Sequence, residues 1–509
     1  MPSKIFSATT FGLDSKLIEV EADLIGDSAK FIIVGLPDAA VQEARERVHS
    51  AIKNSDIAFP RRKIIVNLAP ADLKKVGPGF DLPIAIAVLI TKKYLELSPA
   101  DQKSVFVGEL ALDGTLKPIT GILSIASLLK ELGLTRLYLS KQNADEANLI
   151  NGLTIFPVKT LAELIKHLKG KTQIKPLAPS KIIIGSETKP ILAFAKIKGQ
   201  QLAKRALEIA AAGNHNLLMV GPPGSGKTLL ARSLPELLPP LTIDEALEVT
   251  KIYSVSGLLP EKQPLITIRP FRSPHHTASG IALVGGGSFP KPGEITLAHR
   301  GVLFLDELPE FPRAVLENLR QPLEDGIVTV SRASQTLQFP ARFTLIAAAN
   351  PCPCGFLTDP EKDCKCLPSQ IIRYQKKVSG PLLDRFDLQI EVPRVKFIDL
   401  QSDTTEAEVQ SVINRVHLAR KIQLNRFKDI KQKILTNSEI SSHNIEEYCH
   451  LTEESQKLLK EAMHKFYLSA RGYHRVIKVA RTIADLVESQ EIKIEHLAEA
   501  LQFRITQEN

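Results

Sequence analysis

The sequence predicts an α/β protein in three parts, with a parallel sheet in the middle part. Short apolar strands alternate with helical stretches up to about Lys171, and again from Leu192 to about Pro393. In the second stretch this alternation is typical of parallel strands that are joined by helices. From Asp399 to the end Gly and Pro become rare and a helical period dominates, which predicts an all-helical region.

The predicted domain boundaries follow from these changes in pattern. We expect a first domain at 1–171, a linker at 172–191, a second domain at 192–398 and a helical domain at 399–509. The linker is rich in Pro, Lys and Ser. In the first domain "AKFIIVGLP" and "RRKIIVNLAP" are predicted strands, and "DAAVQEARERVHSAIKNS" is an amphipathic helix with Asp38 as its N-cap.

The composition indicates a soluble, cytoplasmic protein with no membrane segment. Hydrophobic residues make up 44% of the 509 residues and charged residues 24%. No apolar run reaches the roughly eighteen residues that a membrane span needs. The longest run, "LPIAIAVLI", has the length of a buried strand or a buried helix, and the N-terminus lacks the apolar core of a signal peptide.

The net charge of +9 suits a polyanionic partner, although charge alone fits a basic protein without such a partner equally well. The chain contains no Trp, and aromatic residues are only 5%. If nucleic acid binds, we therefore expect contacts to the phosphate backbone rather than stacking of bases on aromatic side chains.

A phosphate-binding loop is the strongest motif of the chain. Gly221–Thr228 matches GxxxxGK[ST], follows a predicted strand at His215–Val220 and precedes a predicted helix. Its backbone N–H groups are expected to surround the phosphates of ATP, with Lys227 at the β- and γ-phosphates and Thr228 on Mg²⁺. The predicted nucleotide-binding residues are Gly221, Pro222, Pro223, Gly224, Ser225, Gly226, Lys227 and Thr228.

Two acidic residues end the next predicted strand. "GVLFLDELPEF" places Asp306 and Glu307 directly after a buried strand at Val302–Leu305. A carboxylate at the carboxyl end of a parallel strand is well placed for Mg²⁺, and a second carboxylate can polarise an attacking water. We assign Asp306 to the metal and Glu307 to the general base; a solvated acidic turn is the alternative.

Polar residues follow the later strands of the second domain. "FTLIAAAN" ends in Asn350, whose amide is suited to hold the attacking water or to sense the γ-phosphate. Arg385, in "SGPLLDRFDLQIEV", is a candidate arginine finger for the γ-phosphate of a neighbouring subunit. The alternative for Arg385 is a salt bridge with Asp384 or Asp387.

The helical domain offers one more cation for the nucleotide. "SARGYHRVIKVARTIADL" begins a helix with Arg471 in its first turn. We expect Arg471 to reach back to the nucleotide and to couple the two domains. Arg475 and Arg481 compete for this role.

This ordered set of motifs resembles the AAA+ ATPases, which work as rings and often as hexamers. In that resemblance Asn350 matches sensor 1, Arg385 the arginine finger and Arg471 sensor 2. "IKGQQLAKRALEIAAAG" resembles the segment that lines the adenine pocket, with Gln200 as the adenine contact.

Two insertions are similar to those of the magnesium-chelatase and MCM branch of AAA+, where they project into the ring pore and grip DNA. One is the Gly-rich segment "FRSPHHTASGIALVGGGSFPKPGEITLAHRG", and the other is a β-hairpin in "LEDGIVTVSRASQTLQFPARFTLIAAANP". The candidate DNA contacts are His275, His276, Lys291 and Arg332, with surface residues of no such role as the alternative.

Motifs along the whole chain resemble the YifB/ComM family of magnesium-chelatase-like proteins, among them "IVGLPDAAVQEARERVHSAI", "NPCPCG" and "VSGPLLDRFD". The resemblance implies a hexameric ATP-driven helicase that moves branch points in single-stranded and branched DNA during recombination, when transforming DNA is integrated. A chelatase-type ATPase that remodels a partner protein and a protein-unfolding regulator are the alternatives.

The N-terminal domain resembles the C-terminal domain of Lon protease, an α+β fold shared with the branch-migration protein RadA. Gly79, Phe80 and Asp81 stand where Lon carries its nucleophile, and Ser124 stands in the region of its catalytic lysine. A Ser–Lys pair needs both groups within hydrogen-bond reach. We therefore expect this domain to be non-proteolytic and to serve assembly or DNA contact.

Four of the five cysteines lie in one loop at 352–366. Cys352, Cys354, Cys364 and Cys366 form C-x-C-x9-C-x-C, which is compatible with a closed tetrahedral Zn²⁺ site. Four free thiols are the alternative. We expect a structural zinc that stiffens the segment between Asn350 and the arginine finger, whereas Cys449 is expected to be a small buried residue.

Overall fold

The computed structural model describes residues 2–26, 28–179, 193–260, 262–287, 290–332, 335–395, 399, 405–428, 434–465 and 469–504. The predicted linker at 172–191 lies outside this described part from residue 180 onward. Contacts divide the chain into two compact units. The first unit comprises Met1–Ile184 and Ile243–Ile266, and the second comprises Gly185–Thr242 and Thr267–Asn509.

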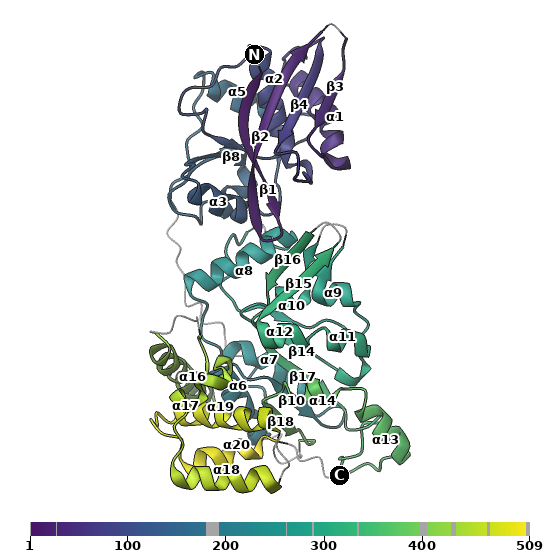
Figure 1. The fold of residues 1–509 in the computed structure, drawn as a ribbon, viewed down its shortest axis with the longest axis vertical. Helices are drawn as coiled ribbons and strands as arrows, with labels where there is room; N and C mark the ends of the chain where they lie inside the picture. The colour runs from purple at the N-terminus through teal and green to yellow at the C-terminus, as the bar shows by residue number, and fades with distance from the viewer. Residues whose placement is uncertain are drawn as a thin grey trace. The chain divides into compact units, whose positions relative to one another are not determined.

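The first unit is built on a seven-stranded sheet in the order β3-β4-β2-β1-β5-β8-β9 (Figure 1). Its strands are β1 (Ser3–Phe11), β2 (Asp14–Ile25), β3 (Phe31–Val34), β4 (Lys63–Ala69), β5 (Val105–Phe106), β8 (Arg136–Ser140) and β9 (Thr154–Val158). The pairs β1–β2 and β2–β4 are antiparallel, and the other neighbours are parallel. Strands β3 and β4 confirm the two strands predicted for this domain.

The helices of the first unit include the predicted amphipathic helix, α1 (Ala39–Lys53). Asp38 caps α1 as expected, because its Oδ1 accepts the backbone N–H of Val41 at 2.8 Å. "LPIAIAVLI", for which strand and helix were both open, forms part of the buried helix α2 (Asp81–Thr91). The smaller elements are β6 (Glu109–Leu110), β7 (Leu116–Lys117), α3 (Ile122–Glu131), α4 (Ala144–Ala147) and α5 (Leu161–Leu168).

Helix α8 (Ile243–Ser256) belongs to the first unit, although it lies inside the predicted range 192–398. It packs against α3, and the hydroxyl of Ser254 hydrogen-bonds the buried carboxylate of Glu146. Glu146 also accepts the backbone N–H of Leu123 at 2.9 Å. The sequence could not show this, because the partners of α8 lie more than a hundred residues earlier in the chain.

The second unit has a five-stranded sheet in the order β11-β14-β17-β10-β18, and every neighbouring pair is parallel. Its strands are β11 (Phe271–Arg272), β14 (Val302–Leu305), β17 (Thr344–Ala349), β10 (Leu217–Val220) and β18 (Leu388–Glu391). This arrangement confirms the predicted parallel α/β sheet. The carboxyl ends of β10, β14 and β17 meet at one edge, where ligands bind in such sheets.

Helices α6 (Gln201–Gly213) and α7 (Lys227–Leu237) flank this sheet. The predicted hairpin is present as β15 (Ile327–Arg332) and β16 (Gln335–Pro340). The smaller elements are α9 (Gly280–Val284), β12 (Gly285–Gly286), β13 (Lys291–Pro292), α10 (Glu294–Leu297), α11 (Arg313–Glu317), α12 (Arg320–Asp325), α13 (Pro368–Gln375) and α14 (Gly380–Leu383).

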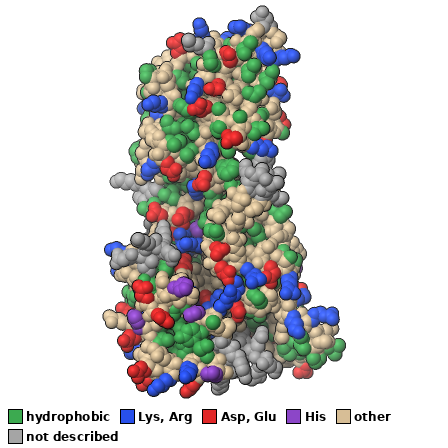
Figure 2. Space-filling model, in the orientation of Figure 1, with side chains coloured by type: hydrophobic (Ala, Val, Ile, Leu, Met, Phe, Trp, Pro, Cys, Tyr) green, Lys and Arg blue, Asp and Glu red, His purple; other side chains and the backbone are tan. Residues whose placement is uncertain are grey.

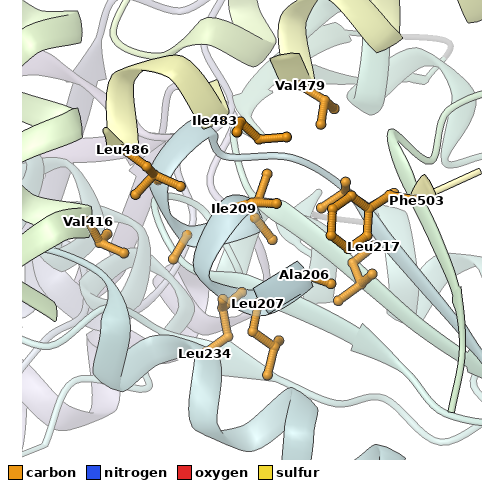
Figure 3. Close-up of a cluster of buried hydrophobic side chains, with 14 of the residues drawn as sticks. Ala206, Leu207, Ile209, Leu217, Leu234, Val416, Val479, Ile483, Leu486 and Phe503 are labelled. Atoms are coloured by element: carbon orange, nitrogen blue, oxygen red, sulfur yellow. The ribbon is translucent and has the colours of Figure 1, made fainter. Parts of the chain in front are cut away.

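The described part of the C-terminal region is built mainly from helices, as predicted. Its helices are α16 (Glu406–Arg426), α17 (Ile445–Tyr448), α18 (Glu453–Lys465), α19 (Ala470–Leu486) and α20 (Ile494–Gln502). Figure 3 shows side chains of α16 and α19 against α6 and β10, with Val416, Ile483, Ile209 and Leu217 among them. The helical region and the sheet therefore share one hydrophobic core. Among the described helices none is long and apolar enough to cross a membrane.

Candidate nucleotide site and cysteine cluster

The phosphate loop connects β10 to α7, as the motif predicts. Gly226 has φ +85° immediately before the helix, a conformation that glycine adopts without strain. A Cβ at Gly221 would lie 2.1 Å from the carbonyl oxygen of Val392, so only glycine fits there. The loop therefore presents its backbone to an anion at the N-terminus of α7.

Lys227 lies inside this loop. Its Nζ donates to the carbonyl oxygens of Gly221 at 2.7 Å and Pro222 at 2.8 Å, and lies 3.5 Å from Oδ1 of Asn350. Burial lowers the pKa of the Lys227 amine, which the charge of Asp306 partly offsets. The structure thus brings Lys227 and Asn350 together from different strand ends.

Thr228 and Asp306 form a second pair at the same edge. The Thr228 hydroxyl donates to Oδ2 of Asp306 at 2.9 Å, and the backbone N–H of Glu307 donates to Oδ1 at 3.0 Å. Hydroxyl and carboxylate oxygens are suited to Mg²⁺, which needs hard oxygen ligands. These residues therefore fit the magnesium that the motif implies.

Glu307 adopts a left-handed backbone with φ +53°. Its Oε2 lies 3.2 Å from Nδ1 of His276, whose ring lies 4.1 Å from that of His275. Sequence reasoning placed His276 among the DNA contacts and missed its contact with the acidic motif. No local signal reveals it, because the two residues lie in separate segments that only the fold brings together.

The other predicted DNA contacts lie on separate segments. Lys291 is exposed on β13, and His275 is exposed before α9. Arg332 ends β15, but its side chain lies outside the described part of the structure. Gln200, predicted for adenine, lies at the phosphate loop: its Nε2 donates to the Ser225 carbonyl at 2.6 Å and to the Pro393 carbonyl at 3.2 Å.

Arg385 is buried, with 3% of its side chain exposed, and it forms an ion pair with Glu324 of α12. The alternative predicted for Arg385 was a salt bridge with Asp384 or Asp387. The structure shows a salt bridge, but its partner is Glu324. Burial lowers the pKa of the Arg385 guanidinium, while the charge of Glu324 raises it. Arg471 approaches the same carboxylate at 3.8 Å, so Glu324 joins both predicted arginines.

The two competitors of Arg471 have other partners. Arg475 pairs with Asp387 at 2.7 Å, and Arg481 is buried against Asp485. Burial alone would raise the pKa of the Asp387 carboxyl, but the charge of Arg475 holds it below its usual range. Arg471 has 59% of its side chain exposed, against 20% for Arg475 and 1% for Arg481, so it is the most accessible of the three to a ligand.

The four loop cysteines converge, as their spacing predicts. Their sulfur atoms all lie within 4.8 Å of one another, and Sγ of Cys352 is 3.4 Å from that of Cys354 and 3.6 Å from that of Cys364. Four bonds of about 2.3 Å to a tetrahedral Zn²⁺ would separate the sulfurs by about 3.8 Å. Backbone N–H groups, that of Phe356 first, lower the pKa of the Cys354 thiol to about 6. Backbone N–H groups also act on Cys364 and Cys366, but burial and the neighbouring cysteines outweigh them and raise the pKa of both thiols.

This cysteine cluster lies against the phosphate loop. Gly355 has φ +84°, and a Cβ there would lie 2.6 Å from Cδ of Pro223. The fifth cysteine, Cys449, is 4% exposed in the hydrophobic core, as predicted. A metal held by the cluster would therefore fix the loop beside the nucleotide site.

A parallel sheet with a phosphate loop and an acidic strand end defines a P-loop domain, here of the magnesium-chelatase type. Residues 193–400 match "Magnesium chelatase, subunit ChlI", 406–504 match its C-terminal family, and 20–143 match "Subunit ChlI of Mg-chelatase". The chain is 45% identical to competence protein ComM of Haemophilus influenzae, over 98% of this chain and 97% of that protein. It belongs to the YifB/ComM family of magnesium-chelatase-like AAA+ proteins.

Other relatives support this placement. YifB of Escherichia coli is 41% identical over 99% of this chain and 97% of its own length. The magnesium-chelatase 38 kDa subunit of Rhodobacter capsulatus is 28% identical, but the match covers only 43% of this chain and 61% of that subunit. The similarity to this chelatase subunit is therefore partial, whereas that to the YifB/ComM proteins spans the chain.

Proposed function

We propose that this protein is an ATP-driven DNA motor that works as a hexameric ring and moves branch points during recombination, as in the integration of transforming DNA. The observation that carries this proposal is the similarity to a competence protein along the whole chain. The assembled nucleotide site supplies the motor, and the net charge of +9 suits a DNA partner.

In the proposed reaction the phosphate loop binds ATP, and Lys227 moves from its carbonyl partners to the β- and γ-phosphates. Thr228 and Asp306 would hold Mg²⁺, which neutralises charge that develops on the phosphates. Glu307 accepts a proton from the attacking water, and Asn350 orients that water.

Gln200 contacts the adenine. Arg385 comes from the neighbouring subunit, and Arg471 couples the helical domain to the nucleotide.

We propose that the N-terminal unit is Lon-like but non-proteolytic, because it has no serine nucleophile. Asp81 accepts a hydrogen bond from Nε of Arg47 at 2.6 Å, and the Ser124 hydroxyl donates to the Leu13 carbonyl at 2.7 Å. Each group is thus occupied by a structural partner. We infer that the N-terminal unit serves assembly or DNA contact. In the two insertions of the second unit, the proposed contacts to DNA in the ring pore are His275, His276, Lys291 and Arg332.

DNA is expected to stimulate ATP hydrolysis by the intact chain, because a motor couples turnover to its track. The measurement is phosphate release with and without single-stranded, forked and four-way DNA. The Glu307→Gln variant controls for contaminating ATPases. If the protein hydrolyses ATP but none of these DNAs stimulates it, the motor is rejected. The second candidate is then favoured, a chelatase-type ATPase that remodels a partner protein. The partial similarity to a chelatase subunit supports this candidate.

The cysteine cluster is proposed to hold a structural zinc, since its four sulfurs fit a tetrahedral site. Purified protein is expected to contain about one zinc per chain, and a chelator is expected to lower the temperature of unfolding. Mass spectrometry of metals and a thermal melt measure both. The Cys449→Ser variant is the matched control and should keep its zinc. A four-cysteine variant of loop 352–366 that assembles and hydrolyses ATP like the wild type would reject this role.

A further inference from the structure

A cleft lies in the second unit, between the segment that follows Glu307 and helix α13. Its volume is about 720 Å³, and it is open to solvent. Four cations line it: Arg313, Arg373, Lys376 and Lys377. We call it the basic groove. Figure 2 shows Lys and Arg side chains beside hydrophobic ones on the lobe where Figure 1 places α13.

The basic groove carries more positive than negative charge, although Arg313 also interacts with the carboxylate of Glu317. Glu310 is the single carboxylate that lines it, and Lys377 already pairs with this carboxylate at 3.0 Å. Within the described residues, Arg373 and Lys376 form no ion pair. Cations that converge in one cleft repel each other, and they attract an anionic ligand from solution.

The lining also indicates which anion binds. Two of the four cations are lysines, which are depleted at protein–protein interfaces, whereas Lys and Arg together are the usual partners of phosphates. Apolar surface from Ile372, which is 51% exposed, suits the sugar faces of a nucleic acid. The aromatic rings nearby, Phe311 and Tyr374, are buried and cannot stack with bases.

We propose that the basic groove binds the phosphate backbone of DNA without regard to sequence. The proposal rests on the proposed DNA motor and adds a binding surface outside the two insertions. It also suggests how DNA binding could affect ATP hydrolysis. The floor of the groove begins at Pro309, two residues after Glu307, so bound DNA contacts the segment that carries the general base.

The test compares the Arg373→Glu/Lys376→Glu double variant with Lys457→Glu/Lys460→Glu. Both pairs are exposed, have the same spacing and change the net charge equally. The first pair lies at the C-terminal end of α13, with Lys376 as its C-cap, and the second lies on α18 of the helical region. Fluorescence anisotropy with labelled single-stranded and forked DNA measures affinity over a series of salt concentrations. Thermal melts check that every variant is folded.

The groove variant is expected to bind DNA at least about 10-fold more weakly near 0.1 M salt, with a slope of log affinity against log salt that is smaller by about 1 to 2. The α18 variant should match the wild type. Equal weakening of both variants, or wild-type binding by the groove variant, would overturn the proposal while the motor survives. If the groove variant keeps DNA binding but loses binding of labelled polyglutamate, the surface serves an acidic protein partner instead. If the wild-type protein binds no DNA, the groove and the motor fail together.

Discussion

Replacing Glu307 by Gln is expected to reduce ATP hydrolysis by about 100- to 10,000-fold, the usual contribution of a general base, while ATP still binds. Glutamine keeps the size of the side chain and the left-handed turn at φ +53°, but it cannot accept the proton of the attacking water. Phosphate release measures hydrolysis, and a fluorescent ATP analogue measures binding. A variant that turns over like the wild type would remove Glu307 from the reaction.

Two comparisons make the Glu307 result specific. Asp325→Asn removes an exposed carboxylate from the same unit and is expected to leave hydrolysis close to the wild-type rate. Asp306→Asn weakens the pair that Thr228 and Asp306 form, so its loss of activity should be partly restored by more Mg²⁺. If Glu307→Gln also responds to Mg²⁺, then Glu307 acts through the metal rather than on the water.

Features that depend on neighbours in sequence were predictable. The phosphate loop follows a strand and begins a helix, and Asp306 follows a strand of buried residues, so local pattern placed each correctly on the sheet. The cysteine spacing predicted one cluster, because all four residues lie in a single loop. The length of "LPIAIAVLI" suited strand and helix alike, and only packing on all sides selects helix α2.

Contacts between distant segments were not predictable. His276 and Glu307 meet because β11 and β14 are adjacent parallel strands, and the sequence does not state that adjacency. Likewise, Glu324 lies in the short helix α12 without any distinguishing motif, yet it contacts Arg385 and Arg471 from two other regions. Arg385, which was predicted to act on a neighbouring subunit, is therefore held by an ion pair within its own chain.

Replacing Arg385 by Ala is expected to reduce ATP turnover by about 1,000-fold or more, the usual effect of losing an arginine finger. In the isolated chain the guanidinium contacts Glu324 and the Pro381 carbonyl. To act on a neighbouring nucleotide, it must exchange Glu324 for the γ-phosphate. Steady-state hydrolysis of the assembled protein measures the loss.

Mixing two inactive variants tests whether Arg385 acts across a subunit boundary. In a mixed ring of Arg385→Ala and Lys227→Ala chains, about a quarter of the interfaces combine an intact phosphate loop with an intact arginine. Activity should return in the mixture if the arginine is supplied in trans. An inactive mixture, despite mixed assembly, would place Arg385 within its own subunit.

The Glu324→Gln variant separates this role from a purely structural one. If the Arg385–Glu324 pair only stabilises the fold, then breaking it from either side should lower stability and activity alike. Glu324→Gln leaves the buried guanidinium of Arg385 without its counter-ion, and Arg385→Ala removes that buried side chain. If Arg385 is a finger that Glu324 restrains, then Glu324→Gln frees the arginine and keeps turnover, whereas Arg385→Ala abolishes it. The ratio of the two activities therefore decides whether this ion pair is a structural contact or the resting position of a catalytic residue.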